Sequence, residues 1–198
     1  MENEAFFKRD GGGYVANPVS RGPWNPQSLH GRVIIGLLAF ELEQRHADPD
    51  FIPARLTVDM HHPRGGNRIK VIDAEFFSGG VGTAGPRRTW MSEVRELVAG
   101  TPLTPFMRVA LCADFASPFA NAGDKGLGYI NSDVTLYINR LPVQEWVGLE
   151  VADHQAADGV AIGECFLYDV EGPIGSATCA ALAQQRRMQL PPADADKA

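Results

Sequence analysis

The chain has 198 residues, 44% of them hydrophobic, and 18 basic residues stand against 24 acidic ones to give a net charge of −6. This composition predicts a soluble globular protein with enough apolar residues for a core. The acidic balance, without a dense basic stripe, argues against nucleic acid as a partner. No stretch is apolar enough to cross a membrane, and the charged N-terminus lacks the apolar segment of a signal peptide.

The three cysteines, Cys112, Cys165 and Cys179, form an odd set without CxxC spacing. Cys112 and Cys165 lie among apolar neighbours, which predicts small core residues of a reduced, cytoplasmic protein rather than disulfides or zinc ligands. His61 and His62 are adjacent on a predicted strand and would point to opposite faces, so they do not predict a metal site. HExxH and GxSxG are both absent, which argues against the common zinc-peptidase and serine-hydrolase classes.

The elements are predicted from hydrophobic periodicity and capping residues. A short strand is expected around Phe6, and Asn25-Pro26 is expected to start a mostly apolar helix that runs to about His46. A second apolar helix follows Thr104, an expected N-cap, and Pro105, which suits the first helical position. Strands are predicted at residues 55–62, 68–77, 90–98, 129–140, 145–154, 159–169 and 174–187, before a disordered tail at 189–198.

The two halves of the chain resemble each other. Asn25-Pro26 and Thr104-Pro105 open the two predicted helices 79 residues apart, and Thr57 and Thr135 mark the following strands 78 residues apart. A consistent offset indicates a tandem duplication, with halves at residues 6–89 and 90–188, the first shorter by about one hairpin. Because an uncovered sheet edge tends to pair, we expect a homo-oligomer that covers it.

A helix wrapped in an antiparallel sheet, repeated twice, is the double hotdog arrangement. The chain is similar to the acyl-CoA thioesterase II family over roughly residues 10–187, through landmarks in this order: RGPWNPQSLHG, RLTVDMHHP, TPFMRVALCADF, YINSDVTLYINRLPVQEW and GPIGSA. The resemblance implies an α+β tandem hotdog with central apolar helices and a truncated first copy. It also implies hydrolysis of an acyl-CoA in fatty acid metabolism, with no metal and no organic cofactor. CoA would lie at the surface, and its acyl chain would lie between sheet and helix.

The resemblance also implies a site. In that family an Asp after the apolar helix, a Ser or Thr on the next strand and a Gln near the last strand activate a water against the thioester. These positions fall on Asp114, Asn131 and Cys179, with Ser132 beside Asn131. Two of the three therefore depart from the family pattern. An amide still orients a water, whereas a thiol is a weak donor and a weak acceptor.

The chemistry of the reaction supports Asp114 apart from the family. Thioester hydrolysis needs a base near a water and donors for the developing oxyanion. Burial against the apolar helix would raise the pKa of this carboxyl and make it a better base near neutral pH. His30 and Gly31, near the first helix, and Thr135 are expected to contact the substrate. The alternative is that Asp114 only caps the loop at 117–121.

Two other functions stay open. A non-catalytic acyl-CoA-binding or scaffold protein would keep the fold after losing the catalytic Gln. Acyl-CoA hydratase chemistry shares the fold but usually wants a His beside the Asp, and no His adjoins Asp114, which counts against it. A Cys179 nucleophile with His154 has no local support.

Overall fold

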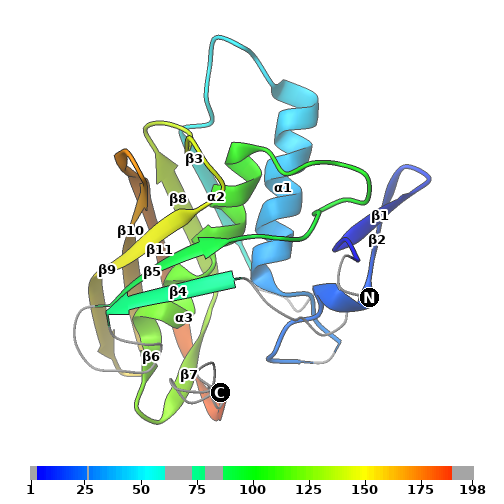
Figure 1. Ribbon diagram of the computed structural model, residues 1–198. Coiled ribbons are helices and arrows are strands. Elements are labelled where there is room, and N and C mark those ends of the chain that lie inside the picture. The colour runs from blue at the N-terminus through cyan, green and yellow to red at the C-terminus, as the bar shows by residue number, and fades with distance from the viewer. Residues whose placement is uncertain (1–3, 26, 61–72, 79–86, 189–198) are drawn as a thin grey trace, which may run out of the picture.

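Helices lie against one face of a single large antiparallel sheet (Figure 1). The computed structural model describes residues 4–25, 27–60, 73–78 and 87–188, with the backbone alone at 73–78 and 186–188. The helices are η1 (Pro18–Ser20), α1 (Gly31–His46), α2 (Pro105–Ala113) and α3 (Ala116–Asn121). The strands are β1 (Phe7–Asp10), β2 (Gly13–Ala16), β3 (Arg55–Asp59), β4 (Asp73–Ser78), β5 (Arg88–Ser92), β6 (Ala122–Gly123), β7 (Gly126–Asn131), β8 (Asp133–Ile138), β9 (Val147–Ala157), β10 (Val160–Asp169) and β11 (Gly172–Met188). In this described part, no helix combines the length and the apolar character needed to span a membrane.

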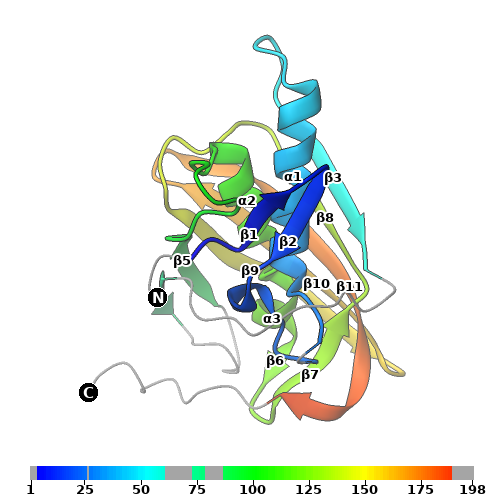
Figure 2. The same cartoon turned by 90° about the vertical axis from the view of Figure 1, so that its right-hand side faces the viewer.

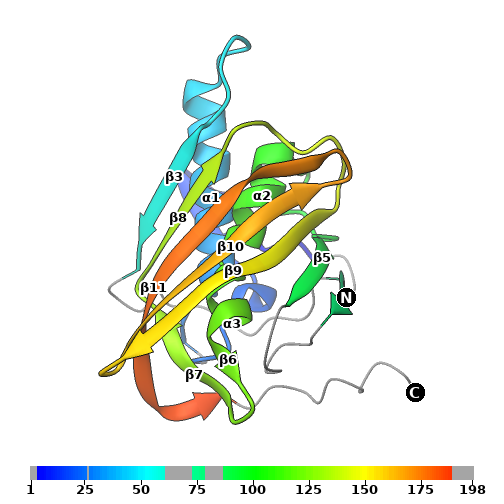
Figure 3. The same ribbon diagram turned by 90° about the vertical axis from the view of Figure 1, so that its left-hand side faces the viewer.

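The strand order of the sheet is β3-β8-β11-β10-β9-β5-β4, and β7 pairs with both β11 and β6. Within the second half the order along the sheet is therefore β5-β9-β10-β11-β8, so β8, which follows the helices, lies at the other side of the β9–β11 meander from β5. Figure 3 looks onto the face of this sheet that the helices leave uncovered. The prediction of an antiparallel sheet wrapped around an apolar helix is confirmed.

The two halves meet at β3 and β8. Thr57 lies directly opposite Thr135 in an antiparallel register, and the two hydroxyl oxygens are 3.2 Å apart. These are the residues that the repeat equates, so the junction relates the strands by an approximate two-fold axis. The boundary between the halves and the truncation of the first copy stay predictions, because residues 61–72 and 79–86 lie outside the described part.

The helix at Thr104-Pro105 forms as predicted. The Thr104 hydroxyl accepts a hydrogen bond from Met107 N–H at 3.1 Å, and Pro105 takes the first position of α2. The predicted start of the other helix is wrong, since α1 begins at Gly31 with His30 as its N-cap. Asn25 instead caps an isolated turn, in which its side-chain oxygen accepts from Gln27 N–H at 2.8 Å.

Three further differences concern the ends and the division of elements. The strand expected at 90–98 ends at Ser92, because Glu93 turns into the interior to pair with Arg32. The strand expected at 129–140 is divided into β7 and β8 at Ser132, and the short helix α3 was not predicted. His61, His62 and the tail at 189–198 lie outside the described residues.

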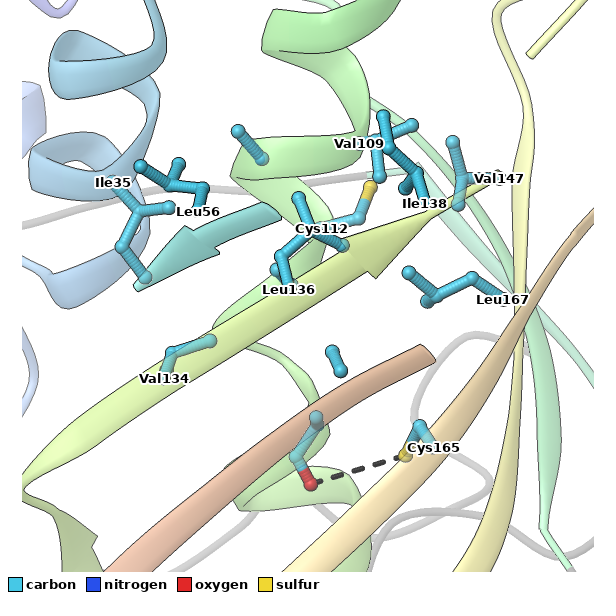
Figure 4. Packing of buried hydrophobic residues seen from close by; sticks show 14 of the residues in the cluster. Ile35, Leu56, Val109, Cys112, Val134, Leu136, Ile138, Val147, Cys165 and Leu167 are labelled. Carbon is cyan, nitrogen blue, oxygen red and sulfur yellow. Dashed lines mark hydrogen bonds between the residues drawn. The ribbon is translucent and has the colours of Figure 1, made fainter. Parts of the chain in front are cut away.

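The main core fills the space between the sheet and the helices (Figure 4). It contains Cys112 and Cys165, both free and buried as predicted, and burial raises the pKa of the Cys112 thiol to about 12. A smaller cluster joins the β1–β2 hairpin, which lies across α1 in Figure 2, to α2 through buried Phe6, Phe40 and Met107. Apolar burial of this kind is the main stabilising term of the fold.

The helices α1 and α2 run antiparallel and close together. A Cβ on Gly36 would lie 2.7 Å from Leu111 Cδ2, and the Thr104 hydroxyl donates to Glu43 at 2.6 Å. Since glycine lacks a side chain, the two helices approach more closely here than larger residues would allow. This packing brings the start of α1 against the end of α2.

Candidate active site

Asp114 is the C-cap of α2 and is only 4% exposed. Its Oδ1 accepts a hydrogen bond from the Asn131 amide at 2.9 Å, and its Oδ2 lies 3.3 Å from His30 Nδ1. The three side chains come from the end of α2, the end of β7 and the N-cap of α1. The structure thus brings together two residues expected at the site from the second half and one from the first.

The pKa of Asp114 moves opposite to the prediction. Burial by itself raises it, but hydrogen bonding and charge from His30, hydrogen bonding from Asn131 and the charge of Arg32 outweigh burial and lower it. The expectation of a raised pKa was wrong because it counted burial without these partners. Asp114 is therefore a buried carboxylate that stays ionised at neutral pH.

His30 corrects a second expectation. No His adjoins Asp114 in the sequence, yet the imidazole of His30 contacts it across the helix pair. His30 Nδ1 also lies 3.2 Å from Arg32 N–H, in the position of a helix N-cap acceptor. The argument against hydratase chemistry, which rested on the absence of this neighbour, no longer holds.

Gly31 allows Asp114 to reach the start of α1. A Cβ at this position would lie 2.6 Å from Asp114 Oδ1 and 3.0 Å from both Cγ and Oδ2. The Gly31 N–H, at the first position of the helix, has no hydrogen-bond partner among the described residues. An unpaired N–H at a helix start is a ready donor for an anion.

A buried ion pair between Arg32 and Glu93, which was not predicted, lies close to the site. Arg32 is 1% exposed, its Nη1 pairs with Glu93, and its guanidinium carbon lies 4.9 Å from the centroid of the Phe6 ring. The charge of Arg32 contributes to the lowered pKa of Asp114. Arg32, a charged residue in an otherwise apolar stretch, was the one sequence signal for this pair.

Two expected site residues are turned elsewhere. The Ser132 hydroxyl donates to Asp133 at 3.0 Å rather than to Asp114. Thr135 alternates with the buried Val134 and Leu136, so it lies on the opposite face of β8 from the core and contacts Thr57. The structure therefore does not bring either side chain to Asp114.

Cys179 is fully buried in β11, where its thiol donates to Gly163 O at 3.5 Å. Burial raises the pKa of this thiol to about 12 against the opposing effect of a hydrogen bond with Ser117. A thiol that stays protonated at neutral pH is a poor nucleophile. His154 lies on the exposed part of β9, so the structure does not pair it with Cys179.

A surface hollow of about 300 Å³ lies away from these residues. It is lined by the β1–β2 turn and the outer side of α1, including Arg9, Tyr14 and Arg45. Neither Asp114 nor His30 borders it, and the arginines are occupied by contacts with Tyr14 and Glu41. The hollow and the cluster around Asp114 are therefore separate features of the molecule.

Comparison with solved structures defines the fold class. A conserved protein with a hotdog fold from Alicyclobacillus acidocaldarius has a TM-score of 0.63 and 10% identity, over 86% of this chain and 92% of that one. A chain from Thermobifida fusca YX has a TM-score of 0.58 and 10% identity, over 91% and 97%. The acyl-CoA thioesterase II TesB2 of Mycobacterium marinum has a TM-score of 0.51 and 11% identity, over 79% and 91%. At these identities the likeness shows the fold alone, and that fold is the hotdog.

The sequence itself matches the family model of the acyl-CoA thioesterase C-terminal domain over residues 43–182. The chain belongs to this family. The match spans 47% of the tesB protein MAP1729c of Mycobacterium avium subs paratuberculosis and 54% of a chain from Novosphingobium aromaticivorans, so it covers only about half the length of each of these two relatives. No curated protein matches it.

Proposed function

We propose that the protein hydrolyses an acyl-CoA thioester to the free acid and CoA at the site built on Asp114. Family membership supports thioesterase chemistry in general. The observation that carries the proposal is a buried, ionised Asp114 held between the Asn131 amide and the His30 imidazole. Groups whose pKa is shifted by burial and by specific partners are enriched at functional sites.

In the proposed reaction, Asp114 and Asn131 orient the site in which a water attacks the thioester carbonyl. The N–H of Gly31 at the start of α1, which has no hydrogen-bond partner among the described residues, would donate to the oxyanion that forms. Collapse of the tetrahedral intermediate breaks the C–S bond and releases CoA. Cys179, the residue at the family Gln position, takes no part, because its thiol is buried and protonated.

The test is CoA release by the purified protein across short, medium and aromatic acyl-CoAs, with Asp114→Asn alongside. We expect turnover in the wild-type protein and a loss of about 1,000-fold in the variant, since the carboxylate that organises the site loses its charge. Asp124→Asn, which changes an exposed Asp in the β6–β7 turn, serves as the matched control. Tight, saturable acyl-CoA binding without turnover would instead support the non-catalytic binding protein.

Hydratase chemistry is the second candidate, because His30 stands beside Asp114. An acid–base pair of this kind would add water across an enoyl-CoA double bond. The same protein preparation separates the two reactions: loss of enoyl absorbance without CoA release supports hydration, and CoA release from saturated acyl-CoAs supports hydrolysis.

The homo-oligomer also stays a proposal. Strand β3 lies at one end of the sheet, and Leu38 and Leu42 of α1 are more than 40% exposed nearby in the first half. A second copy that covers β3 and this side of α1 would bury both. Light scattering that shows a monomer at micromolar concentration would contradict it.

A further inference from the structure

His30 Nδ1 faces two groups that require opposite states of the same nitrogen. Arg32 N–H, 3.2 Å away, requires a lone pair on Nδ1, whereas the Asp114 Oδ2 oxygen, 3.3 Å away, requires a proton there. Only one of these contacts is a hydrogen bond at a time. The ionisation state of Asp114 decides which of the two contacts is the hydrogen bond.

Asp114 favours the proton on Nδ1. Apart from His30, the hydrogen bond from Asn131 and the charge of Arg32 favour the charged form of this carboxyl, which we therefore treat as ionised. A lone pair on Nδ1 would set two acceptors against each other at 3.3 Å in a site where Asp114 is nearly buried. A proton on Nδ1 turns the same contact into a charge-assisted hydrogen bond. The lone pair of the neutral ring then lies on Nε2.

Nε2 is available for chemistry. Among the described residues it has no hydrogen-bond partner, and it is absent from the buried polar atoms left without one, so it keeps contact with solvent. The side chain of His30 is 18% exposed, against 6% for Asp114. A carboxylate that fixes one imidazole nitrogen and leaves the other free is the arrangement by which enzymes orient a general base.

We propose that His30 is the general base of the hydrolysis, with Asp114 as the residue that positions it, which rests on the proposed thioesterase function. His30 Nε2 takes a proton from water as the water oxygen bonds to the thioester carbon. The carbonyl becomes an oxyanion, and its collapse breaks the C–S bond. The imidazolium returns the proton to the leaving CoA thiolate, so the ring ends as it began.

The charges around His30 suit this role. Asp114 faces it from α2, and the neutral Asn131 amide on β7 bonds to the other oxygen of Asp114. Arg32, on the same helix as His30, is paired with the buried Glu93, so their charges largely offset each other. The uncompensated charge next to the imidazole is that of Asp114, which stabilises the imidazolium formed during the reaction.

Nitrogen NMR tests the state of the ring without any substrate. In the ¹⁵N-labelled protein at neutral pH we expect a pyrrole-type signal for His30 Nδ1 and a pyridine-type signal for Nε2, assigned by their loss in His30→Asn. Asp114→Asn should exchange the two, because Arg32 N–H then takes the Nδ1 lone pair. A proton on Nε2 of the wild-type ring would overturn the proposal.

Kinetics test the role. Asn is a favoured N-cap whose side-chain oxygen would accept from Arg32 N–H, so His30→Asn keeps the start of α1 while removing the base. We expect kcat/KM to fall by about 100-fold or more with little change in KM. We also expect the acid limb of the wild-type pH profile, which reports protonation of the base, to be lost in the variant. His46→Asn, at the exposed end of the same helix, should leave both unchanged.

The outcomes separate the two proposals. Wild-type turnover that survives in His30→Asn with the same pH profile overturns the base role alone, and Asp114 is then the base. Absence of CoA release from every acyl-CoA in the wild-type protein overturns the thioesterase function and the base role together.

Discussion

Asp114 and Asp169 are both buried carboxylates in the second half of the chain, 4% and 3% exposed, and the pKa of each is lowered. Their partners differ. Asp169, at the end of β10, accepts from both terminal nitrogens of Arg140 at 2.5 Å. It also accepts from the backbone N–H groups of Val143 at 3.0 Å and Glu171 at 2.9 Å.

The side-chain partner of Asp169 carries a permanent positive charge, whereas the side-chain partners of Asp114 do not. Hydrogen bonds from Arg140 are the main cause of the lowered pKa of Asp169, and a guanidinium does not lose its proton in water at ordinary pH. Asp114 is paired with a neutral amide and with an imidazole, whose Nδ1 donates to it only while that nitrogen carries a proton. The comparison supports a structural role for Asp169 and leaves Asp114 as the carboxylate of the proposed site.

The largest effect on stability is expected from Asp169→Asn. The variant leaves Arg140 without its carboxylate and two backbone N–H groups with a weaker acceptor, so unfolding should become easier by about 3 kcal/mol. Urea denaturation measures this, with the exposed Asp124→Asn as control. The activity of the folded variant should equal that of the wild type. An Asp169→Asn variant that is as stable as the wild type but inactive would contradict the structural role of Asp169.

The stability difference between the wild-type protein and Asp169→Asn should depend on pH. Because the pKa of Asp169 is lowered in the folded state, its contribution to stability is complete above the pKa of an unfolded Asp, about 3.9, and is lost as pH falls toward the folded value. Asp169→Asn lacks this contribution at every pH. The difference in unfolding free energy between the two proteins should therefore shrink below about pH 4. A difference that grows with acidity would contradict the assignment.

The parts of the fold predicted from sequence are those with local causes. The start of α2 depends on Thr104 and Pro105, which are neighbours in the chain, and it was predicted to the residue. The start of α1 was misplaced because Asn25 carries the same capping signal for a mere turn. The strand at 90–98 was drawn too long, because its end is set by a tertiary pair between Glu93 and Arg32.

The site residues likewise divide into those that sequence predicted and those that depend on tertiary contacts. Asn131 was expected near Asp114 from the family order, and the two do form a hydrogen bond. His30 was expected to touch substrate but not Asp114, since the contact depends on how closely α1 and α2 pack. The direction of the Asp114 pKa shift depends on those same partners, so burial alone gave the wrong sign.

The next effect in size concerns Gly31→Ala. Alanine favours the helix itself, but its Cβ would lie 2.6 Å from Asp114 Oδ1, so Asp114 must move from His30 and Asn131. Displacing a catalytic group by about 1 Å costs on the order of 100-fold in rate, and we expect a loss of that size in kcat/KM with the fold retained. The reference variant is Gly12→Ala, where the hairpin leaves open space for a Cβ. Equal activities of the two variants would show that Asp114 does not need its place at the start of α1.

The smallest effect is expected from Asn131→Ala, which removes the neutral partner of Asp114 and leaves the imidazole. We expect kcat/KM to fall by about 10-fold, because Asp114 keeps its contact with His30 but loses the hydrogen bond that fixes its other oxygen. Ser132→Ala is the matched control, since the next side chain along the strand donates to Asp133 instead. If Ser132→Ala lost activity and Asn131→Ala did not, the hydroxyl would be the functional partner. The hydrogen bond from Asn131 to Asp114 would then be like those to Asp169, because it would stabilise the fold without contributing to the reaction.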